Sequence, residues 1–188
     1  QKSPKFGVSE NQSEFETFLT INKTKGEKQM NEKTLNLTWA ALIAALYVVL
    51  TFVANAAGLA SGAIQVRLSE MLTIMPLLTW AAVPGLAIGC VLANFLTGCA
   101  LWDIVFGSIA TLLGALGTYY IGRRKPALGP IFPIVSNALI VPLVLQYVYG
   151  LEGSYWYFMA TVGAGEIISC GVLGWLLYKV LKRTGVFT

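Results

Sequence analysis

The chain has 188 residues, of which 56% are hydrophobic and 12% charged, with a net charge of +4 and a mean hydropathy of +0.68. This composition lies far outside the range of soluble domains and predicts an all-α integral membrane protein. The absence of histidine excludes imidazole metal ligands and imidazole acid–base catalysis.

Residues 1–29 are polar and contain lysine, and they lack the apolar core that a secretory signal requires. Met30 followed by "NEKTLN" resembles a natural start, so we expect residues 1–29 to be a tail that is disordered or not native to the chain. Phe15 and Phe18 leave open a short amphipathic turn on the membrane surface. We assign residues 30–188 to a single domain.

From Leu37 onward, apolar runs recur near the length that a membrane helix needs, about 17 to 25 residues. The second run is short unless the preceding "AIQVR" extends it. The pattern predicts a bundle of six transmembrane helices at about 37–57, 68–80, 83–98, 103–122, 128–148 and 155–178.

The basic residues are distributed very unevenly around these spans. With six spans, both termini share one side with the loop around Arg123, and this side holds every lysine and arginine except Arg67. Short loops rich in lysine and arginine stay cytoplasmic. We therefore predict that both termini are cytoplasmic.

The first span carries alanines at four-residue spacing, which places them in pairs on a helix face: Ala40, Ala44, Ala41 and Ala45. Small residues allow another membrane helix to approach closely. Packing within the bundle is the default explanation, and a docking face for a partner is the alternative.

The connection "GAIQVRLSEML" places Arg67 and Glu70 between two apolar runs. These residues can pair with one another on one helix face, or they can form a polar outer lid that binds a solute. A nearby aromatic and acid, Trp102 and Asp103, offer a stacking face beside a carboxylate, although Trp102 also suits an interfacial belt.

Further polar residues lie inside or at the ends of the later spans, namely Asn94, Asn137, Gln146, Tyr147 and Glu166. Glu166 stands about 16 Å into the last span, near the middle of the hydrocarbon, where a carboxylate is costly unless it faces a cavity or a partner. The amides can simply bond neighbouring helices. Together with the acids they favour a ligand cavity.

Other chemistry is not supported by the pattern. The three cysteines lack CxxC spacing, so no metal site is expected, and no hydrolase elbow predicts catalytic residues. There is no GxxxxGK[ST] loop for ATP, so active transport would need ion coupling or another subunit.

Several segments resemble the QueT family of queuosine-precursor transporters: "WAALIAALYVVLT", "GAIQVRLSEMLTIMPLLT", "PGLAIGCVLANFLTG", "DIVFGSIATLLGALGTYYI", "SNALIVPL" and "GEIISCGVLG". The resemblance implies a substrate-binding S component of an energy-coupling factor (ECF) transporter in the plasma membrane of a prokaryote. Its expected partners are a transmembrane coupling subunit (T component) and two ATPases, which hold the ATP and Mg; no cofactor in this chain and no nucleic acid is expected.

The resemblance also maps the small-residue face of the first helix onto the docking surface of S components. It implies a 7-deazaguanine as substrate, in the aminomethyl or cyano form or as queuine, whose ring N–H and exocyclic amine suit carboxylate acceptors. Candidate substrate-binding residues are Arg67, Glu70, Asn94, Trp102, Asp103, Asn137, Gln146, Tyr147 and Glu166. The alternatives are an S component for another vitamin such as thiamine, or a stand-alone ion-coupled carrier that uses Glu166.

Overall fold

The computed structural model describes residues 8–59 and 65–185, with side chains placed for 31–59 and 65–185. All regular structure in these ranges is helical, as the composition predicts. The chain divides into two compact units, residues 1–37 and 38–188. The later unit contains every candidate site residue.

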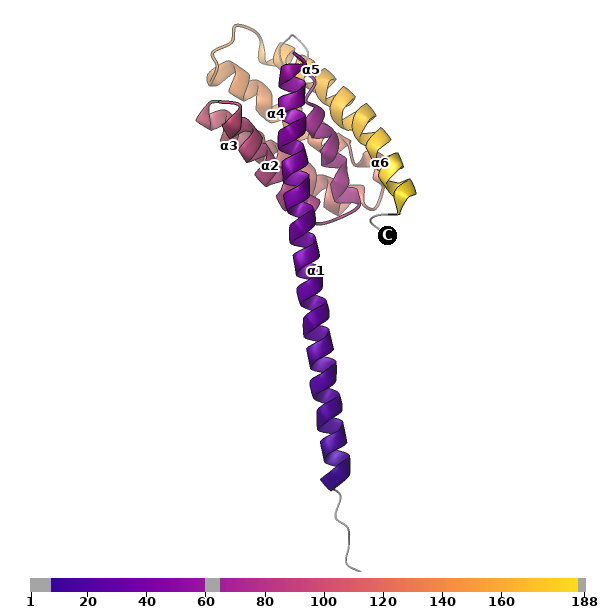
Figure 1. Ribbon diagram of the computed structural model, residues 1–188. Helices are drawn as coiled ribbons and strands as arrows, with labels where there is room; N and C mark the ends of the chain where they lie inside the picture. Colours follow the sequence, from indigo (N-terminus) through magenta and orange to yellow (C-terminus); the bar gives the residue numbers. More distant parts are fainter. Residues whose placement is uncertain (1–7, 60–64, 186–188) are drawn as a thin grey trace, which may run out of the picture. The chain divides into compact units, whose positions relative to one another are not determined.

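The helices follow one another closely along the chain (Figure 1). They are α1 (Val8–Ala56), the 3₁₀ helix η1 (Leu68–Leu77), α2 (Ala82–Leu96), α3 (Leu101–Gly117), the π-helical turn η2 (Thr118–Gly122), the 3₁₀ turn η3 (Pro126–Leu128), α4 (Ile131–Tyr147), α5 (Tyr155–Glu166), the π-helical segment η4 (Ile167–Leu173) and α6 (Gly174–Thr184). Since α3 continues into η2, and α5 through η4 into α6, each series forms one long rod.

Among the described residues, four helical stretches are long and apolar enough to cross a membrane: Asn31–Ala56, Leu101–Gly122, Pro126–Tyr147 and Tyr155–Thr184. The other two predicted spans correspond to the shorter helices η1 and α2, of 10 and 15 residues. At about 2.0 Å per residue for a 3₁₀ helix and 1.5 Å for an α-helix, both reach only about 20 Å of a hydrocarbon core of about 30 Å. The count of six spans therefore stays a prediction.

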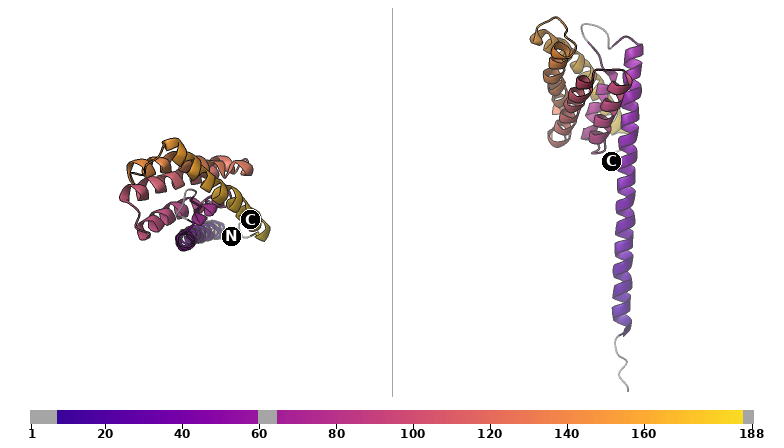
Figure 2. Two further views of the ribbon diagram at one scale, coloured as in Figure 1. Left: turned by 90° about the horizontal axis from the view of Figure 1, so that it is seen from above. Right: turned by 90° about the vertical axis from the view of Figure 1, so that its left-hand side faces the viewer.

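The short helix η1 lies inside the bundle and packs against α2, α3, η2, η4 and α6 (Figure 2). Most of its residues, from Ser69 to Leu77, are buried, so no side of the helix is broadly exposed to solvent or lipid. Seven of its ten residues are apolar, which suits a core position, and its polar residues Ser69, Glu70 and Thr73 are buried with them. The hydroxyl of Thr73 donates to the carbonyl of Glu70 at 2.6 Å within this tight helix.

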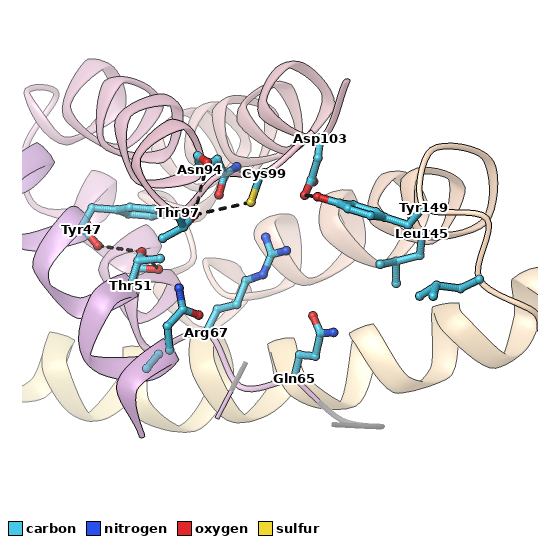
Figure 3. A pocket seen from close by; sticks show the side chains of 14 residues that line it. Tyr47, Thr51, Gln65, Arg67, Asn94, Thr97, Cys99, Asp103, Leu145 and Tyr149 are labelled. Atoms are coloured by element: carbon cyan, nitrogen blue, oxygen red, sulfur yellow. Dashed lines mark hydrogen bonds between the residues drawn. The ribbon is translucent and has the colours of Figure 1, made fainter. Parts of the chain in front are cut away.

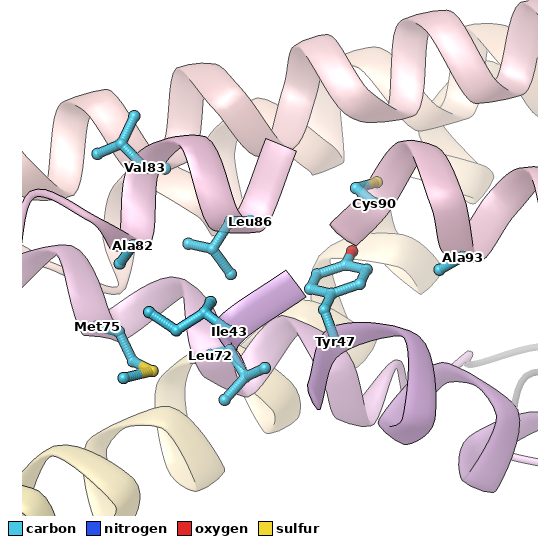
Figure 4. Packing of buried hydrophobic residues seen from close by; sticks show 10 residues of the cluster. Ile43, Tyr47, Leu72, Met75, Ala82, Val83, Leu86, Cys90 and Ala93 are labelled. Carbon is cyan, nitrogen blue, oxygen red and sulfur yellow. The ribbon is translucent and has the colours of Figure 1, made fainter. Parts of the chain in front are cut away.

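The close contact between α1 and α2 depends on two glycines. A Cβ on Gly85 would lie 2.7 Å from the carbonyl oxygen of Ala40, and one on Gly89 would lie 2.8 Å from the Cβ of Tyr47. Ile43 and Tyr47 of α1 then pack into one apolar cluster with residues of η1 and α2 (Figure 4). Small residues thus let the backbones meet, which is how membrane helices associate without a hydrophobic driving force.

Candidate functional site

A cavity of about 370 Å³ opens where α1, α2 and α4 end and α3 begins. Its size lies within the range of small-molecule sites, about 300 to 1,000 Å³. The wall contains both hydrogen-bond donors and acceptors (Figure 3). The lining residues are Tyr47, Thr51, Ala54, Asn55, Gln65, Arg67, Ser69, Asn94, Thr97, Cys99, Asp103, Leu145, Tyr149 and Leu151.

Arg67 extends from the segment before η1 into the middle of this cavity (Figure 3). Burial lowers the pKa of its guanidinium, but attraction by Tyr47, Asp103, Glu70 and Glu166 outweighs that effect and raises the pKa above its usual range. Arg67 is therefore a permanent cation that faces several acids rather than Glu70 alone.

The segment that carries Arg67 is seated against α5. A Cβ on Gly165 would lie only 2.1 Å from the carbonyl oxygen of Gln65, so this close approach requires glycine. The amide of Val66 also donates to the carbonyl of Leu59 at 2.9 Å. Residues 62–64 of the predicted lid lie outside the described residues.

Asp103, in the first turn of α3, is the acid in the cavity wall. The hydroxyl of Tyr149 donates to its Oδ2 at 2.8 Å and accepts from the amide of Ala100 at 3.2 Å. Burial and the neighbouring Asp103 raise the pKa of Tyr149 to about 12, against a weaker opposing effect of the Ala100 amide. The phenol thus stays a donor at physiological pH.

Asn94 and Asp103 lie side by side because Gly107 leaves space for both. A Cβ on Gly107 would lie 3.2 Å from Nδ2 of Asn94 and 3.6 Å from Oδ1 of Asp103. The hydroxyl of Thr97 donates to the carbonyl of Ala93 at 2.8 Å, which keeps the last turn of α2 closed beside the cavity. An amide and a carboxylate together can read a donor and an acceptor on one ligand edge.

A second group of polar side chains lies directly behind the cavity wall; we call Glu70, Glu166, Cys170 and Asn137 the buried acid cluster. The hydroxyl of Tyr47, a cavity residue, donates to Oε1 of Glu70, and Thr111 donates to the same oxygen at 3.4 Å. The Cys170 thiol donates to Oε2 of Glu166 at 3.0 Å. One ligand atom from each of Glu70, Glu166 and Cys170 lies within 4.8 Å of the others.

Parts of this cluster have no hydrogen-bond partner in the described structure. Oε2 of Glu70 and both amide atoms of Asn137 are buried and unpaired. Asn137 lies beside both carboxylates without hydrogen-bond geometry to either. Because a buried unpaired polar group costs about 1–3 kcal/mol, such atoms are expected to be satisfied by a bound ligand, ion or water.

A sequence model of the QueT transporter family matches residues 37–183. The chain belongs to the QueT transporter family. The "Queuosine precursor transporter QueT" of Lactococcus lactis subsp. cremoris (strain MG1363) is 28% identical over 162 residues, which cover 80% of this chain and 95% of that relative. No solved structure matches the chain. Its place in a transporter family makes it a membrane transport protein rather than an enzyme.

In this QueT-family chain the predicted site residues fall into three groups. Arg67, Asn94 and Asp103 line the cavity, and Glu70, Asn137 and Glu166 form the acid cluster behind it. The remaining three do not line the cavity: Trp102, Gln146 and Tyr147. Trp102 is 58% exposed and stacks on Phe106, and Tyr147 is 78% exposed, as expected for an interfacial aromatic belt.

Tyr47, Thr51 and Tyr149 are cavity residues that sequence reasoning did not select. A signal for Tyr47 and Thr51 was present, because they continue the stripe of Ala40 and Ala44 at helical spacing, and that stripe faces the core. For Tyr149 no local pattern distinguishes it from Tyr147.

The four alanines proposed for docking in the QueT-family chain lie on two faces of α1. Ala40 and Ala44 are buried against Gly85 and Gly89 of α2. Ala41 and Ala45 are exposed, with Leu42, Leu46 and Val49 also exposed on this part of the helix. Of these four alanines, Ala41 and Ala45 are therefore the pair at the surface of the helix.

Proposed function

We propose that this chain is the S component of an ECF-type transporter and that it takes up a queuosine precursor, a 7-deazaguanine. Two findings support the assignment: the family match over residues 37–183, and the name of the Lactococcus relative. The observation that carries it is a cavity of about 370 Å³ in a QueT-family chain, with Asp103, Asn94 and Arg67 in its wall.

The lining suits a flat heterocycle with donors on one edge. A 7-deazaguanine presents a ring N–H and an exocyclic amine, which a carboxylate accepts together, and a ring carbonyl, which an amide or guanidinium can bond. In the proposal Asp103 or Glu70 supplies the acceptor, and Asn94 or Arg67 supplies the donor. An anionic ligand fits less well because Arg67 is the only base among the described residues that line the cavity.

The cavity opens toward the outside in this proposal. It lies where α1 ends and α3 begins, whereas the basic segment Arg123–Lys125 follows η2 at the other end of the α3 rod. Basic loops stay cytoplasmic, which places the cavity at the outer face and both termini in the cytoplasm. The short helices η1 and α2 then complete six spans in the plasma membrane of a prokaryote.

Energy for uptake comes from other subunits. The sequence has no phosphate-binding GxxxxGK[ST] loop, so two ATPases that bind ATP and Mg, joined through a T component, would drive transport. The exposed face of Ala41 and Ala45 on α1 is the proposed contact with the T component, because small residues permit close helix packing.

Isothermal titration of the purified chain, without partners, tests the proposal directly. We expect the parent to bind 7-cyano- or 7-aminomethyl-7-deazaguanine, or queuine, and to ignore thiamine. Asp103→Asn should weaken binding by about tenfold, equivalent to about 1.4 kcal/mol, because the acceptor pair is lost. Glu152→Gln removes the same charge from an exposed residue and should not change affinity.

Two results would overturn this reading. If only thiamine binds, the assignment as an S component stands but the proposed substrate is wrong. If none of these ligands binds, the proposed substrate class is refuted. Uptake by the chain in vesicles without ATPase subunits would favour an ion-coupled carrier, for which the buried Glu166 offers a proton site.

A further inference from the structure

The buried acid cluster holds two carboxylates that come from distant parts of the chain. Glu70 lies in η1 and is 0% exposed, and Glu166 ends α5 and is 4% exposed. Their ligand atoms lie within 4.8 Å of one another. Two carboxyl groups so close together in a buried place cannot both stay ionised unless a cation lies beside them; otherwise they share a proton.

The hydrogen bonds already present do not neutralise the pair. Glu70 accepts from Tyr47 and Thr111 through one oxygen only, and Glu166 accepts from the Cys170 thiol. These donors are uncharged groups. Among the described residues Arg67 is the one base in the cavity lining, and its guanidinium attracts both carboxylates from the cavity in front of the cluster.

Unpaired polar atoms beside the carboxylates point to a ligand with several N–H donors. Oε2 of Glu70 and the carbonyl oxygen of Asn137 are unpaired acceptors, and Asn137 is only 1% exposed. An alkylammonium group has three donors and one positive charge, which match two carboxylates and one amide oxygen. The cluster also adjoins the cavity, because Tyr47 and Ser69 line the cavity and Tyr47 bonds Glu70.

We propose that Glu70, Glu166 and Asn137 bind an ammonium group carried by the substrate, so that the chain selects a cationic 7-deazaguanine over an uncharged one. This inference rests on the proposed function and names the substrate class within it. The deazaguanine ring occupies the cavity beside Tyr47, whose hydroxyl bonds Glu70, and its side arm is directed toward the cluster. The aminomethyl form carries a primary amine, whose ammonium form has three N–H donors, and queuine carries a secondary amine, whose ammonium form has two; the cyano form carries neither.

A metal ion is the other cation that this cluster could attract. The Cys170 thiol, however, is engaged in hydrogen bonds: it donates to Glu166 at 3.0 Å and accepts from Thr73 at 3.3 Å. A metal ligand would have to be the thiolate. The test therefore includes a chelator.

The experiment compares 7-aminomethyl- with 7-cyano-7-deazaguanine by isothermal titration, in the parent, in Glu166→Gln and in the exposed control Glu152→Gln. We expect the parent and the control to bind the aminomethyl form at least tenfold more tightly. Glu166→Gln should lose at least tenfold in affinity for the aminomethyl form and change less than threefold for the cyano form. EDTA should change none of these values.

Each other outcome overturns the inference at a defined point. Equal or tighter binding of the cyano form by the parent refutes ammonium selection and leaves the proposed function intact; this comparison needs no variant to fold. If a folded Glu166→Gln protein loses affinity equally for both ligands, the assigned contact between Glu166 and the ammonium group is refuted. A requirement for metal, shown by loss of binding in EDTA and recovery with Zn²⁺, assigns the cluster to a metal ion instead. If neither deazaguanine nor queuine binds, the proposed function itself fails.

Discussion

The contact between Gly165 and the Arg67 segment provides a sharp test of how the cavity is built. A Cβ at position 165 would lie 2.1 Å from the carbonyl oxygen of Gln65 and 3.0 Å from its carbonyl carbon. An ordinary carbon–oxygen contact is about 3.3 Å. Gly165→Ala must therefore push the Gln65 backbone away by about 1.2 Å, and Arg67 follows two residues later.

The expected cost falls on ligand binding. Inserting one methyl group into a packed site costs about 1–3 kcal/mol, and 1.4 kcal/mol corresponds to a tenfold change in affinity. If the segment moves, binding of the proposed deazaguanine ligand should weaken roughly 10- to 100-fold, because Arg67 leaves its place in the cavity.

Gly163→Ala is the matched control on the same helix. Its added Cβ would meet only the Cβ of Ala138 at 3.8 Å, an ordinary contact. Both substitutions gain the same helix propensity of about 1 kcal/mol, so only the contact with Gln65 differs. Isothermal titration gives the affinities and thermal unfolding in detergent shows that both variants fold. If Gly165→Ala binds as tightly as Gly163→Ala, the Gln65 contact does not position Arg67.

Two further substitutions test the cavity wall and the α1 surface. Tyr149→Phe removes the donor to Asp103 and should weaken ligand binding by about 2- to 10-fold. Since the pKa of Tyr149 is raised to about 12, the phenol keeps its proton below that pH and loses it as the pH rises through this value. The ratio of parent to variant affinity, measured by titration, should therefore stay constant between about pH 6 and 9. A ratio that falls to one in this range would contradict the assigned donor. Ala41→Trp should abolish pull-down of the proposed T-component partner and leave ligand affinity unchanged. Leu113→Trp, on an exposed face of α3, should leave both unchanged. Normal pull-down with Ala41→Trp would exclude that face as the contact.

The sequence is informative wherever the signal is local. Hydropathy identifies the membrane class and locates four helices that are long enough to span, because the bilayer imposes a length on each apolar run. Arg67, Asn94 and Asp103 stand out as polar residues in apolar surroundings, and all three line the cavity. Rarity of a polar group in a membrane segment carries this information in a single sequence.

Choices that depend on packing are beyond such reasoning. The alanine pairs of α1 look equivalent in sequence, yet Ala40 and Ala44 meet the glycines of α2 while Ala41 and Ala45 are exposed. Trp102 and Tyr147 are mainly exposed, although their neighbours in sequence, Asp103 and Tyr149, line the cavity. The direction of a side chain is set by how the whole helix is rotated against its neighbours.

The sequence alone determined that this chain is a helical membrane protein, that its motifs resemble the QueT family, and that a few acids lie in apolar surroundings. Composition, the length of apolar runs and motifs are properties of the chain itself, so no tertiary structure is needed to read them. Only the tertiary structure decided that Glu70, Glu166 and Cys170 meet in one cluster and that Tyr47 links this cluster to the cavity. These residues approach one another because η1 is packed inside the bundle against α3, η4 and α6, and contacts between distant segments arise only when the helices pack.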